Sequence, residues 1–127
     1  MSAFNSALRT LVEAAGGRID AFYFCPHLEP KDLAPGDVPC TCSKPAPGLL
    51  FEAAADFGIE LRQSIFIGDK PSDLAAGRSA GCITAFLHHD RPVALEPTPD
   101  ITARDLPAAL DQITPVFTET TVLRSIR

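Results

Sequence analysis

Three cysteines and a histidine stand close together in a stretch that has little else to fold around. Cys25 and His27 are separated from Cys40 and Cys42 by twelve residues, LEPKDLAPGDVP, which include three prolines and a glycine. Prolines at this density exclude a regular helix or a central strand, and few apolar residues anchor the segment. Three thiolates and one imidazole form a complete tetrahedral ligand set for zinc. The spacing therefore predicts a structural zinc that closes this loop, since four protein ligands leave no open position for water.

The same cysteines admit other interpretations. A Cys25–Cys40 or Cys25–Cys42 disulfide, or three unrelated buried thiols, would also fit the sequence. Residues 1–11 lack the basic start and apolar stretch of a signal peptide, so we expect a cytoplasmic protein, in which zinc is favoured over a disulfide. The fourth cysteine, Cys82, lies in an apolar run and is expected to be a small core residue.

The composition is that of one globular domain and excludes two classes of partner. The chain has 127 residues, of which 46% are hydrophobic and 21% charged, and its formal charge is −5. The lysines and arginines form no cluster that would bind a phosphate backbone, so we expect no nucleic-acid partner. No apolar run approaches the roughly 20 residues of a membrane span, so we expect no membrane partner.

The hydrophobic pattern predicts alternating helices and strands. After residue 88 the pattern weakens into a proline-rich loop, with a short edge strand at 101–102 beyond it. Such alternation predicts an α/β fold with a mainly parallel, Rossmann-like sheet. The predicted helices span residues 6–15, 47–57, 73–80 and 105–113, and the predicted strands span residues 19–24, 64–67, 82–87 and 101–102.

A Gly-Asp turn follows the predicted strand at 64–67, in the sequence IFIGDKPSD. Ligands of open parallel sheets bind at the carboxyl ends of the strands, where Asp69 would lie. Its carboxylate suits a hard cation such as Mg²⁺. Asp73, four residues later, could cap the next helix or orient Lys70. Both aspartates could equally be turn and cap residues without a further role.

A lysine follows the cysteine pair directly, in the sequence Ser43-Lys44-Pro45. The zinc loop would hold the Lys44 backbone still, and a lysine fixed at a sheet edge is a good partner for phosphate. A single lysine is more often a solvated surface residue. One helix separates Lys44 from Asp69, as a strand–loop–helix–strand unit requires to bring both to one edge.

These motifs resemble a known family. The runs YFCPH, CTCSKPAPG and IGDKPSD are similar to those of the haloacid dehalogenase superfamily, in its histidinol-phosphatase-like branch and the heptose-bisphosphate phosphatase group within it. The likeness covers about residues 4 to 113. It implies a Mg²⁺-dependent sugar-phosphate phosphatase with a Rossmann-like core and a structural zinc loop.

The resemblance also implies a role for each residue. The zinc ligands would be Cys25, His27, Cys40 and Cys42. Lys44 would be a catalytic residue that binds the transferring phosphoryl group, Asp69 would bind Mg²⁺, and Lys70 would lie beside the phosphate. Fixed cations of this kind stabilise the charge that develops on phosphoryl oxygens.

The sequence departs from the family pattern in two places. Ser43 stands where the heptose-bisphosphate phosphatases usually carry an arginine, which bears on the substrate. The family begins with a strand that ends in DxDxT, whose first aspartate is the nucleophile, and this sequence contains no DxDxT. Without a carboxylate nucleophile no aspartyl-phosphate forms, so we expect no turnover by this chain alone.

The sequence therefore predicts a partial phosphatase-like domain over residues 1–113, N-terminally truncated relative to the family, with a zinc loop at 25–44 and a tail at 114–127. The alternative is a non-catalytic zinc-binding remnant or interaction module. Missing strands would leave sheet edges unpaired and an apolar face uncovered, which would favour self-association or a complementing chain.

Overall fold

The structure, a computed structural model, describes residues 3–25, 33–36, 40–42, 44–92, 96 and 98–116. It is a mixed α/β fold. The described residues include the single-turn 3-10 helices η2 (Leu61–Gln63) and η3 (Thr114–Val116) besides the main elements. In chain order these are α1 (Ala3–Ala14), α2 (Gly48–Phe57), β1 (Ile65–Gly68), α3 (Pro71–Ala80), β2 (Ile83–Leu87), β3 (Ile101–Ala103) and α4 (Leu106–Ile113).

The three strands form one parallel sheet in the order β1-β2-β3. Ile65 pairs with Ile83 at one end of β1 and Gly68 with Phe86 at the other, and β2 continues alongside β3. The strands are parallel, so their carboxyl ends share one edge of the sheet. The turns after β1 and β2 therefore lie next to each other, as the sequence predicts.

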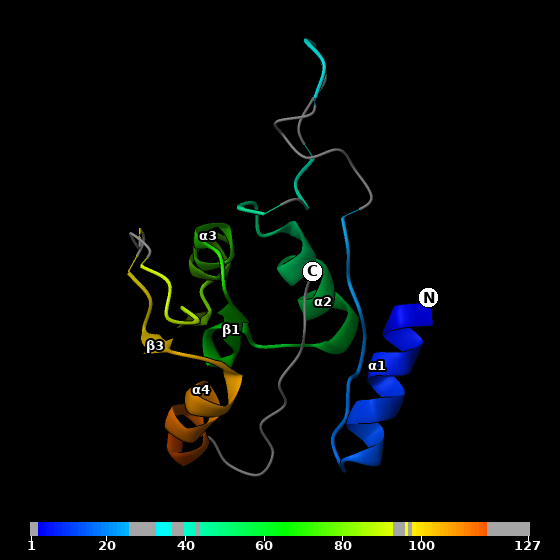
Figure 1. Ribbon diagram of the computed structural model, residues 1–127. Coiled ribbons are helices and arrows are strands. Elements are labelled where there is room, and N and C mark those ends of the chain that lie inside the picture. Colours follow the sequence, from blue (N-terminus) through cyan, green and yellow to red (C-terminus); the bar gives the residue numbers. More distant parts are fainter. Residues whose placement is uncertain are drawn as a thin grey trace.

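Helices cover both faces of this sheet (Figure 1). On one face, Phe66 and Cys82 pack with Leu50 of α2 and Ala76 of α3. On the other face, residues of all three strands pack against α4. Successive strand residues point to opposite faces, so the sheet presents apolar side chains to the helices on both sides, and β2 is the most deeply buried of these strands.

The predicted helix boundaries are confirmed to within a few residues, and their caps show why. Gly58 ends α2 in the left-handed conformation at φ 63°. Pro71 occupies the first turn of α3, where its missing N–H removes no helical hydrogen bond, so α3 begins two residues before the predicted start. At α4, the Asp105 carboxylate accepts a hydrogen bond from the Ala108 amide at 3.0 Å.

The predicted strand at 19–24 is wrong: this segment belongs to no strand of the described sheet. It runs as an irregular chain between α1 and α2 (Figure 1). The Tyr23 hydroxyl donates a hydrogen bond to the Asp56 carboxylate of α2 at 2.5 Å, and the Arg9 guanidinium of α1 lies 5.3 Å from the centre of the Phe22 ring. Aromatic and β-branched residues favour a strand only when a neighbouring strand supplies the backbone partners, and these side chains pack on helices instead.

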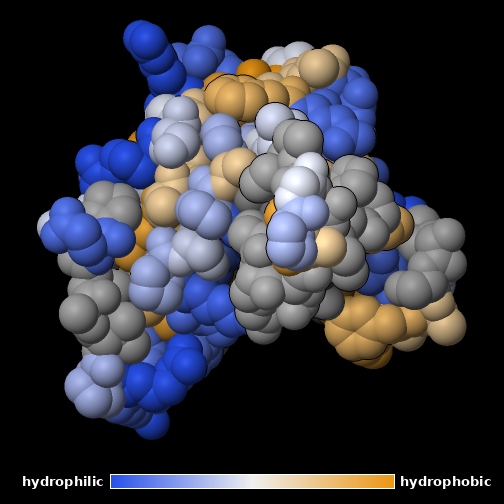
Figure 2. Space-filling view, turned by 90° about the horizontal axis from the view of Figure 1, so that it is seen from above, coloured by the Kyte–Doolittle hydropathy of each residue, from blue (hydrophilic) through white to orange (hydrophobic). Residues whose placement is uncertain are grey.

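The expected unpaired edge and uncovered apolar surface both occur among the described residues. β1 has a strand neighbour on one side only. α1 buries none of its residues, and hydrophobic areas lie exposed between hydrophilic ones in the view of Figure 2. The largest exposed apolar side chains are Phe4, Leu11, Phe24, Phe51, Phe57 and Leu106. No helix in the described ranges is both long and apolar enough to cross a bilayer.

Candidate functional site

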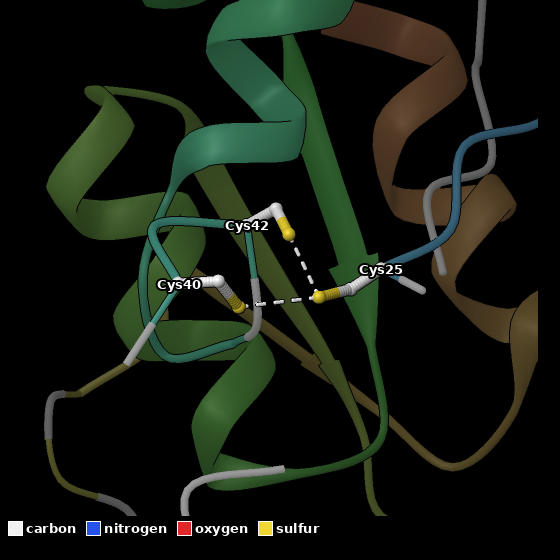
Figure 3. A group of neighbouring side chains, drawn as sticks. All are labelled: Cys25, Cys40 and Cys42. Carbon is white, nitrogen blue, oxygen red and sulfur yellow. Dashed lines mark hydrogen bonds between the residues drawn. The ribbon is translucent and has the colours of Figure 1, made fainter. Parts of the chain in front are cut away.

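Three cysteines from two separate segments meet beside α2. Cys25 belongs to the irregular segment after α1, while Cys40 and Cys42 lie shortly before α2 in the chain (Figure 3). The Cys25 sulfur lies 3.3 Å from that of Cys40 and 2.7 Å from that of Cys42. An S–S bond measures about 2.05 Å, so these are contacts between thiols rather than disulfides.

This cluster has the dimensions of a metal site. The three sulfur atoms all lie within 4.8 Å of one another. Tetrahedral zinc with Zn–S bonds of about 2.3 Å places its sulfur ligands about 3.8 Å apart. The donor set is therefore suited to zinc. His27, the fourth ligand expected from the sequence, lies outside the described residues.

The pKa values of Cys42 and Cys82 are both raised, but for different physical reasons. Hydrogen bonding to Cys25, followed by desolvation and the proximity of Cys40, raises the pKa of Cys42 to about 12. Burial in the apolar core raises the pKa of Cys82 to about 11. Cys82 packs with Phe66 and Leu50 in the apolar core, which agrees with its expected role as a core residue.

A backbone hydrogen bond joins Thr41, which lies between Cys40 and Cys42, to the first residue of α2. The Gly48 amide donates a hydrogen bond to the Thr41 carbonyl at 2.8 Å. A Cβ atom at Gly48 would lie 2.1 Å from that carbonyl oxygen, so only glycine permits this approach. This hydrogen bond closes the chain between Thr41 and Gly48 into a loop, and Lys44 lies between these two residues in the sequence.

Lys44 reaches from this loop to the edge of the sheet, where its ammonium pairs with Asp73 Oδ1. The Asp73 side chain is only 7% exposed, and the Lys44 side chain is 27% exposed. The second carboxylate oxygen of Asp73 accepts hydrogen bonds from the amides of Asp69 and Lys70, each at 3.1 Å. One buried carboxylate therefore holds both the lysine and the turn after β1.

Gly68 makes room for this carboxylate. A Cβ atom at Gly68 would lie 2.3 Å from the Asp73 Cβ and 2.5 Å from its Oδ2. Because the neighbour is buried and held by three donors, it cannot move aside cheaply.

We expect Gly68→Ala to lower the free energy of unfolding by about 2–3 kcal/mol and to loosen the turn at Asp69, since overpacking at a fixed side chain forces the backbone to shift. Urea denaturation followed by circular dichroism measures this change. Gly58→Ala is the control: it has nothing within 4 Å but a φ of +63°, so backbone strain alone should cost about 1–2 kcal/mol. Equal losses in the two variants would contradict the clash.

Asp69 and Lys70, the other predicted site residues, stand at the same edge and are exposed. The Asp69 carboxylate makes no hydrogen bond or ion pair with any described residue, so it is available to a cation. Lys70 contributes its backbone amide to the cap, and its side chain is likewise unpaired within the described part of the chain. Asp73 holds the Lys70 backbone rather than orienting its side chain.

Two contacts at this edge were not predicted. The sequence indicated a capping role for Asp73 but not its ion pair with Lys44. The Arg91 guanidinium, from the loop after β2, donates to the Asp69 carbonyl at 3.4 Å.

Comparisons with known proteins agree on one kind of relative. The model of the HAD-hydrolase-like family matches residues 41–109, which is just over half of the chain and includes Lys44, Asp69 and Asp73. The D-glycero-alpha-D-manno-heptose-1,7-bisphosphate 7-phosphatase of Campylobacter jejuni is 41% identical over 70 residues, which are 55% of this chain and 36% of that protein. The D-glycero-D-manno-heptose-1,7-bisphosphate 7-phosphatase of Thermosynechococcus vestitus is 36% identical over 115 residues, with coverage of 81% and 58%.

A solved structure shows the same fold. The D,D-heptose 1,7-bisphosphate phosphatase from B. bronchiseptica, in complex with magnesium and phosphate, superposes with a TM-score of 0.71 at 27% identity. The superposition covers 91% of this chain and 63% of that one. The chain thus spans less than two thirds of the length of each of these relatives.

Proposed function

Because the chain belongs to the HAD-hydrolase-like family, we propose that it carries part of the active site of a Mg²⁺-dependent sugar-phosphate phosphatase of the heptose-bisphosphate type. The observation that supports this most strongly is the shared carboxylate of Asp73, which fixes Lys44 and the Asp69 turn together at the carboxyl edge of the sheet. This edge is where open parallel sheets bind their ligands.

Each residue at the edge has a distinct task in phosphomonoester hydrolysis. Lys44 binds the phosphoryl oxygens, and its pairing with Asp73 keeps the ammonium in place before the substrate arrives. Asp69 offers its carboxylate to Mg²⁺, which is held in proteins by one or two carboxylates together with substrate phosphate and water. The bound ion would neutralise charge on the phosphoryl oxygens. Lys70, exposed beside Asp69, adds positive charge next to the phosphate.

The cysteine cluster has a structural task in this proposal. Zinc bound by Cys25, Cys40 and Cys42, with His27 as fourth ligand, would tie the segment after α1 to the turn before α2. The hydrogen bond between Gly48 and Thr41 would then hold the loop that carries Lys44 in place. Cysteines stay reduced and free to bind a metal in a reducing compartment, which is consistent with the cytoplasmic location expected from the sequence.

The sequence contains no DxDxT, so we propose that this chain alone binds phosphate without hydrolysing its esters. Within the described residues β1 pairs with a strand on one side only, and its other side offers a place for a further strand, from a second copy or a complementing chain. The alternative function is a zinc-binding or interaction module without phosphate chemistry.

Titration of the purified chain with inorganic phosphate and MgCl₂, followed by ³¹P NMR, tests the proposal. We expect saturable binding that depends on Mg²⁺. Lys44→Met should weaken it about tenfold or more, because a charge-assisted bond to phosphate is lost. Arg62→Gln removes a cation from the opposite edge of the sheet, before β1, and should leave the affinity unchanged.

Other results would revise the proposal in specific ways. A wild-type chain that holds zinc but binds no phosphate would favour the non-catalytic module. Release of phosphate from heptose 1,7-bisphosphate by the purified chain would refute the expectation that it does not turn over alone.

A further inference from the structure

The turn after β2 has an unusual backbone. His89 and Asp90 both adopt the left-handed conformation, with φ of 49° and 60°. Residues with a side chain seldom take this conformation, and two in succession are rarer still. Such strain persists only where the surrounding structure imposes it, and it is concentrated at functional sites.

Contacts from the end of β3 hold this turn. The His88 amide donates to the Ala103 carbonyl at 3.0 Å, and the His89 amide donates to the Arg104 carbonyl at 2.7 Å. The Asp90 amide donates to Nδ1 of His88 at 3.0 Å, and its carboxylate pairs with Arg104 at 2.6 Å. The turn is therefore fixed although it lies at the surface.

The fixed turn directs Arg91 toward the candidate site. The Arg91 amide donates to the His88 carbonyl at 2.8 Å, and its Nε lies 3.4 Å from the same oxygen. Its Nη2 reaches the Asp69 carbonyl at 3.4 Å. These partners are all uncharged, and no carboxylate of the described residues pairs with Arg91, so its positive charge is not neutralised within the described part of the chain.

Arg91 and Lys44 are both linked to the turn at Asp69, but through different atoms. The Asp69 amide binds Asp73, the partner of Lys44, whereas the Asp69 carbonyl binds Arg91. Asp73 neutralises Lys44, so among the described cations at this edge Arg91 and Lys70 keep their charge available, and of these two only Arg91 carries a guanidinium. A guanidinium offers a planar fork of donors that matches the geometry of phosphate.

We propose that Arg91 is a specificity-determining residue that binds a second, non-reacting anionic group of the substrate. The site would then select sugars that carry two phosphates over those that carry one. This inference rests on the proposed function, because the first phosphate is the one placed by Lys44 and Asp69.

Calorimetric titration of the full chain with two probes, in the presence of MgCl₂, tests this role. The probes are inorganic phosphate, which occupies one anionic position, and heptose 1,7-bisphosphate, which occupies both. We expect Arg91→Gln to weaken the bisphosphate about ten- to hundredfold and inorganic phosphate less than twofold. Arg91→Lys, which keeps the charge but not the fork, should restore part of the loss, and Arg62→Gln should change neither affinity.

The outcomes separate this inference from the proposed function. A wild-type chain that binds phosphate, but binds the bisphosphate no more tightly, overturns the role of Arg91 alone. An equal loss for both probes in Arg91→Gln would show that Arg91 merely braces the Asp69 turn, and no loss for either would show that it has no role. If the wild type binds neither probe, the proposed function fails and this inference fails with it.

Discussion

Asp73→Asn is expected to lower the free energy of unfolding by about 2–3 kcal/mol and to abolish measurable phosphate binding. The substitution removes a nearly buried negative charge that serves Lys44 and two backbone amides at once. An asparagine of the same shape has only one acceptor oxygen. Its NH₂ group would replace the other oxygen and would point a donor at either the Lys44 ammonium or the two backbone amides. Leaving a half-buried lysine ammonium and a backbone amide without an acceptor carries this cost. Urea denaturation and ³¹P NMR titration measure the two effects.

The control for this variant is Asp111→Asn, which removes the same charge from an exposed position on α4. It should change stability by less than about 0.5 kcal/mol and leave phosphate binding intact. If Asp73→Asn also behaved in this way, the carboxylate would be an ordinary helix cap. The link between Lys44 and the Asp69 turn would then have no energetic importance.

The cysteine cluster provides the second large effect. Purified protein is expected to hold one equivalent of zinc, and Cys42→Ala should lose it, since a site without its third thiolate is no longer closed. Because the metal ties together two segments that are far apart in the sequence, its loss should cost about 3 kcal/mol of stability or more. Elemental analysis gives the zinc content, and thermal unfolding with and without EDTA gives the change in stability.

Cys82→Ala is the matched control, because it removes a thiol that lies in the core and away from the cluster. This variant should retain its zinc and respond to EDTA as the wild type does. The raised pKa of Cys82 also predicts that its thiol resists labelling at pH 8, where a pKa of about 11 leaves a hundredfold smaller thiolate fraction than a pKa of 9.0. Zinc content that is equal in both variants, or absent from the wild type, would contradict the proposed zinc site.

The core of the fold was predictable because its signals are local. In IFIGDKPSD, an apolar run, a glycine and a proline at a helix start each dictate their own geometry, and the structure follows them residue by residue. The segment at 19–24 was predicted wrongly for the opposite reason. Its strand pattern needs a partner strand far away in the sequence, and the composition of the segment does not say whether that partner is present.

The candidate site was predictable in its positions more than in its contacts. Strand ends and the cysteine spacing located Lys44, Asp69 and the thiol cluster. The pairing of Lys44 with Asp73 depends on a side chain crossing from one loop to another, which no spacing rule describes. Arg91 lies in a loop whose left-handed residues, His89 and Asp90, carry no glycine to mark the turn.

The strand order has a consequence for how the chain folds. β1, β2 and β3 pair in the order in which they occur, and each crossover is short enough that no distant segments must find each other. Folding rates rise when contacts are local, because less chain entropy is lost before the contacts form. Residues 65–113 should therefore fold early, as a cooperative unit that exchanges its amide hydrogens slowly. The cysteine turn and α1 would dock on it afterwards, so native-state hydrogen exchange should show α1 opening first.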